Sequence, residues 1–390
     1  MEADDLRSQV VQEIEARRSE LRDLSLEIHA SPELGFQEAK ASGWLCDYLE
    51  QNGFQVERGF AGLQTAFKAS YGTARPAIAF FAEYDALPEL GHACGHNIIA
   101  AAAAGAGIAA KKTVDKLGGS VHVIGTPGEE VFGGKAIMIG KGAFDDLDVA
   151  MIIHPSSRDV ATFEGLACIS LEVEYFGKAV HAAARPEEGI NALEALILAY
   201  NNVNSLRQHV RERSRIHGII TKGGDAPNIV PEYTSAVFLV RAGDMQYLEE
   251  LQQKVLDCFV AAAVATGARL EYKWGNVAYT PLRSNPVLAT LFCQNMESLG
   301  RAMGMSDPLS RLGSTDMGNV SQVVPSIHPL VAMVSPEISV HSPQFAEAAR
   351  SETGERALLD GAGAMALTLV DLLASPEMMA EVKEAFLQQQ

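Results

Sequence analysis

Hydrophobic residues in the first part of the chain recur with a spacing that alternates between helix-like and strand-like. In residues 6–30 the apolar side chains fall on one helical stripe, and Ser31-Pro32 ends the pattern. Strands that alternate with helices are typical of an α/β sheet covered by helices on both faces. The pattern predicts helices over 6–30, over 38–51 and from Asn97 onward, and strands near 54–58, 63–70, 77–83, 120–125 and 148–153.

The pattern changes near Gly165. Residues 169–176 alternate apolar and polar side chains, as a half-buried strand does. From there to residue 280 the predicted order is strand, helix, strand, strand, helix, strand, which is the ferredoxin-like arrangement. We therefore expect a small domain, 169–280, inserted into a larger domain formed by 1–168 and 281–390. The small domain is predicted to hold strands over 169–176, 216–221, 233–241 and 268–275, and helices over 190–209 and 244–266.

Beyond residue 281 the chain returns to the pattern of the larger domain. An apolar run over 327–334 predicts one strand, and His341 lies in the loop just after it. The same region is predicted to contain helices over 286–303, 355–374 and 376–388.

Composition and charge narrow the class of protein. The chain has 390 residues, of which 47% are hydrophobic and 21% charged, so it suggests an ordinary soluble protein of two domains. The formal net charge of -18 argues against a nucleic-acid partner and against an anionic membrane surface. The longest apolar stretch, Ile98 to Ala110, is too short to span a bilayer. The 5 scattered cysteines do not resemble a disulfide framework, and the acidic start does not resemble a signal peptide, so we expect a cytoplasmic protein.

Side chains that can bind metal ions recur where predicted strands end. The carboxyl ends of parallel strands meet at one edge of a sheet, so these side chains are expected to lie close together. In the pair Glu129-Glu130, neighbouring side chains on an extended loop point in different directions, so one can bind metal while the other acts as a base. Thiolate favours zinc, while carboxylate and imidazole also accept manganese. The predicted ligands are Cys94, His96, Glu130, His154 and His341, with Glu129 as general base.

Each of these side chains also has an ordinary structural interpretation when it is taken alone. Cys94 and His96 could be a buried cysteine beside a helix-capping turn, and Glu129-Glu130 could be a solvated turn. His154 could be a strand-end histidine that hydrogen-bonds to the backbone, and His341 could be exposed in a surface loop. Two other functions also stay open: a thiol hydrolase with Cys94 as nucleophile and His96 as base, and a non-catalytic protein that keeps a structural metal.

Six short runs, spread over nearly the whole chain, form a specific combination: His29–Phe36, Glu83–Pro88, Gly91–Asn97, Gly125–Glu130, Gly177–Arg185 and Gly313–Ser321. In these runs the sequence resembles the aminoacylase/carboxypeptidase superfamily of dinuclear metallopeptidases, peptidase family M20. It looks like the branch of amidohydrolases that cleave auxin conjugates, hippurate-like acyl amino acids and aminobenzoyl-glutamate. Residues 83–85 and 313–321 look closest to aminobenzoyl-glutamate hydrolases and to dipeptidases of the β-alanyl-lysine type.

The resemblance implies a fold and a role for individual residues. The fold is an aminopeptidase-like α/β catalytic domain with an inserted ferredoxin-like α+β domain that serves as lid and dimerisation domain. Asn97 departs from the family pattern, because many auxin-conjugate hydrolases carry Asp there, and this favours the dipeptidase side. By resemblance Cys94 bridges two metal ions, Glu129 is the base, and the terminal ligands are His96, Glu130, His154 and His341. By the same resemblance His181 polarises the scissile carbonyl across the dimer interface. Asn228 and Arg241 hold the substrate carboxylate or carbonyl.

Residues and resemblance together predict a metal-dependent amidohydrolase with two divalent ions per subunit, Zn2+ or Mn2+. Its substrate is expected to be a small molecule, either a dipeptide or an N-acyl amino acid, with aminobenzoyl-glutamate as the alternative. The expected assembly is a homodimer through the inserted domain. Of the other histidines, His92 is the one expected to orient a ligand.

Overall fold

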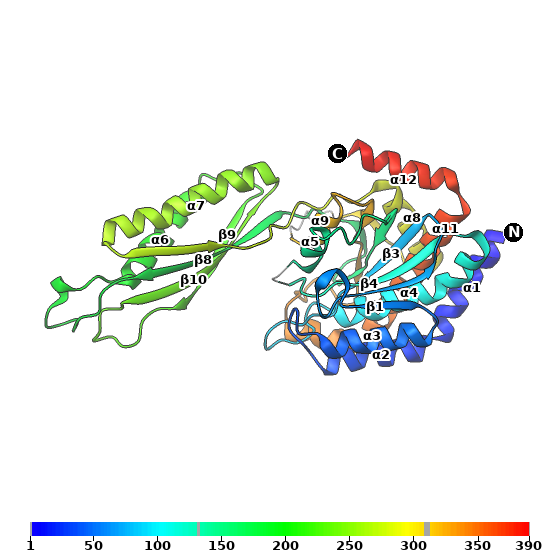
Figure 1. The fold of residues 1–390 in the computed structure, drawn as a ribbon, viewed down its shortest axis with the longest axis horizontal. Coiled ribbons are helices and arrows are strands. Elements are labelled where there is room, and N and C mark those ends of the chain that lie inside the picture. The colour runs from blue at the N-terminus through cyan, green and yellow to red at the C-terminus, as the bar shows by residue number, and fades with distance from the viewer. Residues whose placement is uncertain (1, 131–132, 308–312, 390) are drawn as a thin grey trace. The chain divides into compact units, whose positions relative to one another are not determined.

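The computed structural model describes residues 2–130, 133–307 and 313–389. The chain forms two compact units (Figure 1). The larger unit comprises Met1–Glu164 and Leu282–Gln390, and the smaller unit comprises Gly165–Pro281. The smaller unit thus leaves and re-enters the larger one as a single inserted segment.

A six-stranded mixed sheet forms the centre of the larger unit, in the order β1-β2-β4-β3-β5-β13. The strands β4, β3, β5 and β13 run parallel, whereas β1 and β2 join as antiparallel strands at one edge. Because parallel strands need a crossover, a long helix connects β3 to β4. The strands are β1 Gln55–Arg58, β2 Phe67–Gly72, β3 Ala77–Ala82, β4 Ser120–Gly125, β5 Val149–Met151 and β13 Ser326–Ile327.

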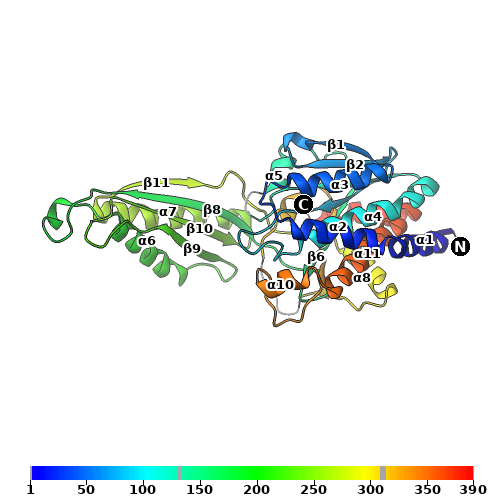
Figure 2. The ribbon, with the colours of Figure 1, turned by 90° about the horizontal axis from the view of Figure 1, so that it is seen from below.

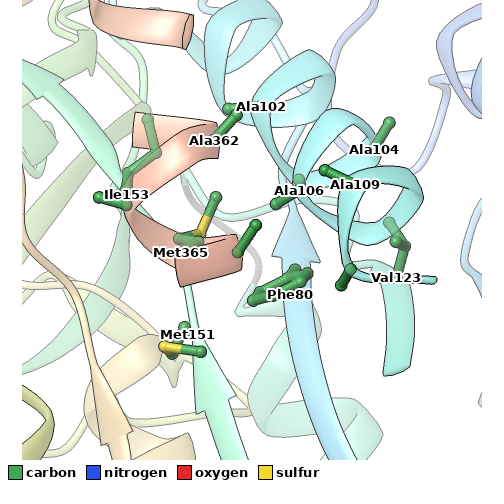
Figure 3. Packing of buried hydrophobic residues seen from close by; sticks show 14 of the residues in the cluster. Phe80, Ala102, Ala104, Ala106, Ala109, Val123, Met151, Ile153, Ala362 and Met365 are labelled. Atoms are coloured by element: carbon green, nitrogen blue, oxygen red, sulfur yellow. The ribbon is translucent and has the colours of Figure 1, made fainter. Parts of the chain in front are cut away.

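Side chains of β3 alternate between two hydrophobic clusters, one on each face of the sheet. Ile78 and Phe80 pack with α4 and α11, whereas Ala79 and Phe81 pack with side chains from α5 and α9. Figure 3 shows Phe80 beside the alanines of α4 and Met365 of α11. By length and composition α11 could cross a membrane, but 83% of its apolar window is buried, as in a core helix. These helices are α4 His96–Leu117, α5 Gly134–Ile139, α9 Met317–Val320 and α11 Glu352–Ala374.

The N-terminal helical stretch is divided into two helices, whereas the sequence predicted one helix over 6–30. Arg17 leaves the helical conformation (φ -99°, ψ 7°), and its guanidinium pairs with Glu13 and Glu20 on either side of the break. The buried apolar stripe continues across Arg17, so hydrophobic spacing could not reveal the break. The remaining helices of this unit are α1 Glu2–Ala16, α2 Arg18–Ala30, α3 Ala39–Gln51, the 3-10 turn Phe60–Gly62, α8 Pro286–Ser298, α10 Pro343–Ala348 and α12 Pro376–Gln388.

The strand predicted over 327–334 is also divided. Pro329, which has no backbone N–H to donate, separates two short strands that belong to different sheets. The helix predicted over 286–303 ends earlier, where Gly300 takes a left-handed conformation (φ 82°). A second sheet, ordered β12-β7-β14-β6, was not predicted. Its strands are β6 His154–Ser156, β7 Val160–Thr162, β12 Gly304–Ser306 and β14 Leu330–Ala332.

The smaller unit contains a four-stranded antiparallel sheet in the order β11-β8-β10-β9, and Figure 2 shows the four strands in this order from top to bottom. Inward side chains such as Val173 and Phe238 pack with α6 and α7 in one hydrophobic cluster. Asp244 caps α7 by accepting a hydrogen bond from the N–H of Tyr247 (2.7 Å). The ferredoxin-like prediction is confirmed. The elements are β8 Ala167–Phe176, the 3-10 turn Pro186–Glu188, α6 Ala192–Arg207, β9 Arg215–Lys222, β10 Tyr233–Ala242, α7 Met245–Thr266 and β11 Arg269–Trp274.

Candidate metal centre

The segment between β3 and α4 brings Cys94 to the carboxyl end of the sheet. Gly95 lies at the N-terminus of α4 with a left-handed backbone (φ 80°). A Cβ atom on Gly95 would lie only 2.9 Å from Pro155, so glycine is required for both the backbone and the space. This close approach places Cys94 beside the segment that carries His154.

Two histidines present the same nitrogen, Nε2, toward Cys94 or its neighbours. The Nδ1–H of His96 donates to the backbone oxygen (2.9 Å) and Oδ1 (3.0 Å) of Asp85. The Nδ1–H of His154 donates to the backbone oxygen of Pro155 (2.7 Å), and its Nε2 lies 3.3 Å from Cys94 Sγ. Because these contacts keep the proton of the neutral ring on Nδ1 in both histidines, each neutral ring has a lone pair on Nε2 that can bind a metal ion.

The loop after β4 carries the two glutamates, and buried carboxylates hold its backbone. Glu38 accepts a hydrogen bond from the N–H of Gly128 (2.9 Å), and Asp85 accepts one from the N–H of Glu130 (3.0 Å). Glu129 is buried, and Glu130 Oε1 points to the same space as His96 Nε2, 3.9 Å away. Asp85 thus orients both His96 and the backbone of Glu130.

His341 enters the site from the loop before α10. Its backbone is left-handed (φ 62°), and its N–H donates to the backbone oxygen of Ala93 (3.0 Å). Its Nε2 lies 3.7 Å from Glu130 Oε1, while its side chain is 51% exposed. The structure therefore places His341 at the solvent-facing side of the cluster.

The arrangement of donor atoms fits a site for two metal ions. Three groups of side chains each offer ligand atoms within 4.8 Å of one another, and Cys94 belongs to two of them. Within the described ranges, His96 Nε2 and Glu130 Oε1 are buried and have no hydrogen-bond partner. Buried polar atoms without partners are rare unless something else binds them. The groups are Cys94 with His96 and His154, Cys94 with Glu130 and His341, and His96 with Glu129 and Glu130.

Crowding of acidic groups in a buried space shapes the electrostatics of the site. Burial, followed by the nearby charges of Glu83 and Glu130, raises the pKa of Glu129 well above its usual value. Burial and then Glu130 also raise the pKa of the Cys94 thiol well above its usual range. Burial opposes a charge on His96, but Cys94 and Asp85 outweigh it and raise its pKa. Such a cluster favours the binding of cations.

Sequence reasoning missed a buried ion-pair network beside this cluster. Lys135 is fully buried, and its Nζ lies 2.5 Å from Glu83 Oε1 and 2.6 Å from Asp316 Oδ1. Glu83 and Asp316 lie in two of the runs that resemble the family, which was the available signal. Nothing in the sequence marks Lys135, because lysine is ordinarily exposed.

His92, which was expected to orient a metal ligand, does not hydrogen-bond to any of the proposed ligands within the described part of the chain. His92 is buried and packs against His29, with ring centroids 5.9 Å apart. Burial, followed by His96, lowers its pKa to about 3. His328, which the sequence did not single out, instead packs against His154 with ring centroids 5.4 Å apart.

The three predicted residues of the smaller unit fall in two places. His181 and Asn228 are exposed neighbours, because His181 pairs with Ile229 in a β-bridge and the N–H of Ala182 donates to the backbone oxygen of Asn228 (3.0 Å). Arg241 lies on β10 opposite Cys168, toward the far end of that strand. A strand of this length spans roughly 30 Å, so the structure brings His181 and Asn228 together and separates Arg241 from them.

Comparison with known proteins identifies relatives of this chain. A family model for the peptidase dimerisation domain matches residues 167–266. The chain is 38% identical to the Xaa-Arg dipeptidase of Mus musculus, covering 98% of this chain and 92% of that protein. It is 35% identical to a p-aminobenzoyl-glutamate hydrolase polypeptide of Escherichia coli, over 70% of this chain and 61% of that protein.

Solved structures share the fold. A Bacillus subtilis protein described as a dinuclear metal binding peptidase from the M20 family superposes with a TM-score of 0.69 at 18% identity, over 92% of this chain and 99% of the other. A putative aminohydrolase from Staphylococcus aureus superposes with a TM-score of 0.72 at 18% identity, over 94% of this chain and 100% of the other. Fold, site and relatives define a metal-dependent hydrolase of amide bonds. The chain belongs to the M20 peptidase family, in the branch of aminoacylases and aminobenzoyl-glutamate hydrolases.

Proposed function

We propose that this enzyme is a dipeptidase whose two metal ions are held by the Cys94 cluster, with Glu129 as general base. The observation that carries the proposal is that three groups of ligand atoms, each within 4.8 Å, share members and so describe one two-ion centre. The similarity to Xaa-Arg dipeptidases over nearly the full chain supports a dipeptide substrate with a basic C-terminal residue. The proposed ligands are Cys94, His96, Glu130, His154 and His341.

Glu129 is proposed to carry the proton during hydrolysis. Divalent ions at this site would acidify water and polarise the amide carbonyl. Glu129, buried next to Glu130, would accept the proton of the attacking water and then donate it to the leaving amine.

The resemblance to the family assigns Cys94 as the ligand that both ions would share, and this fits its place in two of the three ligand groups, as His96 and Glu130 also have. The Cys94 thiolate favours zinc, whereas the carboxylate and imidazole ligands also suit manganese. The free state of all five cysteines supports a reducing compartment such as the cytoplasm, where Cys94 stays available as a ligand.

The smaller unit is proposed to mediate a homodimer and to supply substrate contacts. The match to a peptidase dimerisation domain supports the dimer. His181 and Asn228 are separated from Arg241 along the sheet, so a substrate site that uses all three would draw them from two subunits. In this arrangement His181 would polarise the scissile carbonyl, and Asn228 and Arg241 would bind the carbonyl or carboxylate of the substrate.

A second candidate is hydrolysis of aminobenzoyl-glutamate, supported by 35% identity to the Escherichia coli hydrolase polypeptide. A thiol hydrolase is disfavoured, because that mechanism would give Glu130, His154 and His341 no shared purpose, although the three lie beside Cys94.

Metal-dependent turnover on a defined panel separates these functions. The protein is stripped with a chelator, reloaded with Zn2+ or Mn2+, and assayed on Ala-Arg, Ala-Lys, Ala-Glu, N-acetyl amino acids and aminobenzoyl-glutamate. We expect no turnover without metal and the highest kcat/KM on dipeptides ending in a basic residue. Fastest cleavage of aminobenzoyl-glutamate would support the second candidate. Turnover that survives chelation but is lost on alkylation of Cys94 would support a thiol hydrolase, and no turnover in the metal-loaded protein would support a binding role.

A further inference from the structure

Glu83 presents a buried carboxylate oxygen to the metal-binding side of His96. Glu83 directly follows β3 and is fully buried. One oxygen, Oε1, lies 2.5 Å from Lys135 Nζ. The other oxygen, Oε2, has no hydrogen-bond partner in the part of the chain that the structure describes, and it lies 3.6 Å from His96 Nε2, which has none either.

The distance between these two atoms matches a shared ion better than a direct contact. At 3.6 Å it exceeds the length of an N–H···O hydrogen bond. Two ligand atoms that each lie about 2.1 Å from one tetrahedral ion are separated by about 3.4 Å. Glu83 Oε2 is also nearer to His96 Nε2 than Glu130 Oε1 is, at 3.9 Å. The geometry therefore leaves room for an ion, or for a water bound to it, between Glu83 and His96.

Lys135 and Asp316 prevent Glu83 from turning away. Asp316 accepts hydrogen bonds from both Nζ (2.6 Å) and the backbone N–H (2.9 Å) of Lys135. All three side chains are 0% exposed, so the ammonium has no solvent to exchange for its partners. Two carboxylates around one ammonium leave one negative charge in excess, which a buried site must neutralise. The Glu83 oxygen that does not contact Lys135, Oε2, faces His96.

We propose that Glu83 is a further residue of the metal centre, binding the ion held by His96 directly or through one water, and that Lys135 with Asp316 positions it. This inference rests on the proposed two-ion function. It adds to the centre a carboxylate that is neither a predicted ligand nor the base.

Metal affinity tests the assignment. Kd values for Mn2+ and Zn2+ are measured by competition with a chromophoric chelator, and stoichiometry by elemental analysis, for the wild-type protein and for Glu83→Gln. We expect Glu83→Gln to weaken one of the two ions by about 10–100-fold while the other is less affected. Glu83→Asp keeps the charge for Lys135 but withdraws the carboxylate by one methylene, and it should show an intermediate loss. Unchanged Kd values in both folded variants would overturn the inference.

Asp148→Asn provides the matched control. Asp148 is a buried carboxylate at the opposite end of β3, where it accepts a hydrogen bond from the N–H of Ala77 (2.9 Å). The control should lower the Tm and leave both metal Kd values unchanged. If the network around Lys135 served only the fold, Glu83→Gln would behave in the same way.

A crystal structure of the metal-loaded wild-type protein gives a test that does not depend on any variant folding. We expect Glu83 Oε2 about 2.1 Å from an ion, or sharing a water with it. If both ions are bound and Glu83 contacts neither an ion nor a water bound to one, the inference is overturned and the proposed function is left intact. A wild-type protein that binds no ion would instead contradict the proposed function.

Discussion

Cys94 Sγ lies 3.3 Å from His154 Nε2, although 60 residues separate them along the chain. Gly95 makes this contact possible, because any side chain there would collide with Pro155. The position after Cys94 is therefore as important for the centre as a ligand is. This relationship gives the first prediction.

Gly95→Ala should destabilise the larger unit and weaken metal binding. The new Cβ would combine a strained backbone (φ 80°) with a 2.9 Å approach to Pro155, at a cost of about 2–4 kcal/mol in the free energy of unfolding. Gly59→Ala is the control, since Gly59 is also left-handed (φ 70°, ψ 30°) but has nothing within 4 Å of its Cβ position. Urea unfolding and metal Kd are measured for both. Equal effects of the two variants would contradict the role of the Pro155 contact.

Glu129→Gln should lower kcat by about 10²–10⁴-fold while the protein still binds metal. The amide keeps the size of the side chain but cannot accept the proton of the attacking water. Glu130→Gln, one residue on, should instead lower metal content, because Glu130 belongs to two of the ligand groups. Steady-state kinetics and elemental analysis of both variants distinguish a base from a ligand. A Glu129→Gln protein with normal kcat would rule out this base.

Most of the fold was readable because it depends on local periodicity. The strand predicted over 120–125 is β4 Ser120–Gly125, whose buried run is bounded by glycines. The order of elements in the smaller unit likewise followed from alternation and helical spacing. The break at Arg17 and the division at Pro329 were missed because the apolar pattern continues through both. The local backbone, and not burial, decides them.

For the site, the sequence indicated the side chains with metal-binding chemistry, and the structure brings those six together. It could not indicate the residues that act through packing. No local sequence feature marks Lys135 or His328, and both are buried only because of tertiary contacts. The sequence also could not show that Arg241 lies away from Asn228, because that separation depends on where each residue falls along the folded sheet.

Metal binding should stabilise the larger unit against heat. Glu130 lies within ligand distance of Cys94, and Glu129 lies within the same distance of Glu130, so a bound cation would offset the negative charge that gathers there. An ion at about 100 times its Kd contributes about 2.7 kcal/mol, which corresponds to a rise in Tm of several degrees. Cys94→Ala removes the shared ligand and should abolish most of the rise. A Tm that does not respond to Mn2+ or Zn2+ in the wild-type protein would contradict the centre.

Glu38 should make stability depend on pH between about 4.5 and 7. Burial raises the pKa of its carboxyl to about 7, and the carboxyl accepts hydrogen bonds from Thr65 and Gly128. Because the folded state holds this proton more tightly than the unfolded state, the contribution of Glu38 is full below about pH 4.5 and is lost as the pH rises to about 7. The change amounts to about 3 kcal/mol.

Glu38→Gln cannot titrate and so removes this dependence. The difference in unfolding free energy between wild type and Glu38→Gln, measured in urea, should fall by about 3 kcal/mol from pH 4.5 to pH 8. All other titrating groups are common to the two proteins and cancel in the difference. A difference that stays constant across this range would show that Glu38 does not titrate there.

The edge of the smaller unit should be the dimer interface. Strand β9 is an edge strand of the sheet, and it exposes two large apolar side chains, Ile219 (66% exposed) and Ile220 (43%). The neighbouring helix α6 adds Ile197, which is 40% exposed. An exposed edge strand with apolar side chains favours pairing with another chain, and a second copy offers the same edge for an antiparallel match.

Ile219→Lys combined with Ile220→Lys should convert the dimer to a monomer, because charged side chains on an edge strand oppose pairing. Val264→Lys is the control: Val264 is 80% exposed on α7, a helix that packs on β10, β8 and β11. Light scattering after gel filtration gives the mass of each variant. We expect a dimer for the wild type and Val264→Lys and a monomer for the double variant. If His181 acts in the neighbouring subunit, kcat should fall with the loss of the dimer, and a fully active monomer would contradict that role.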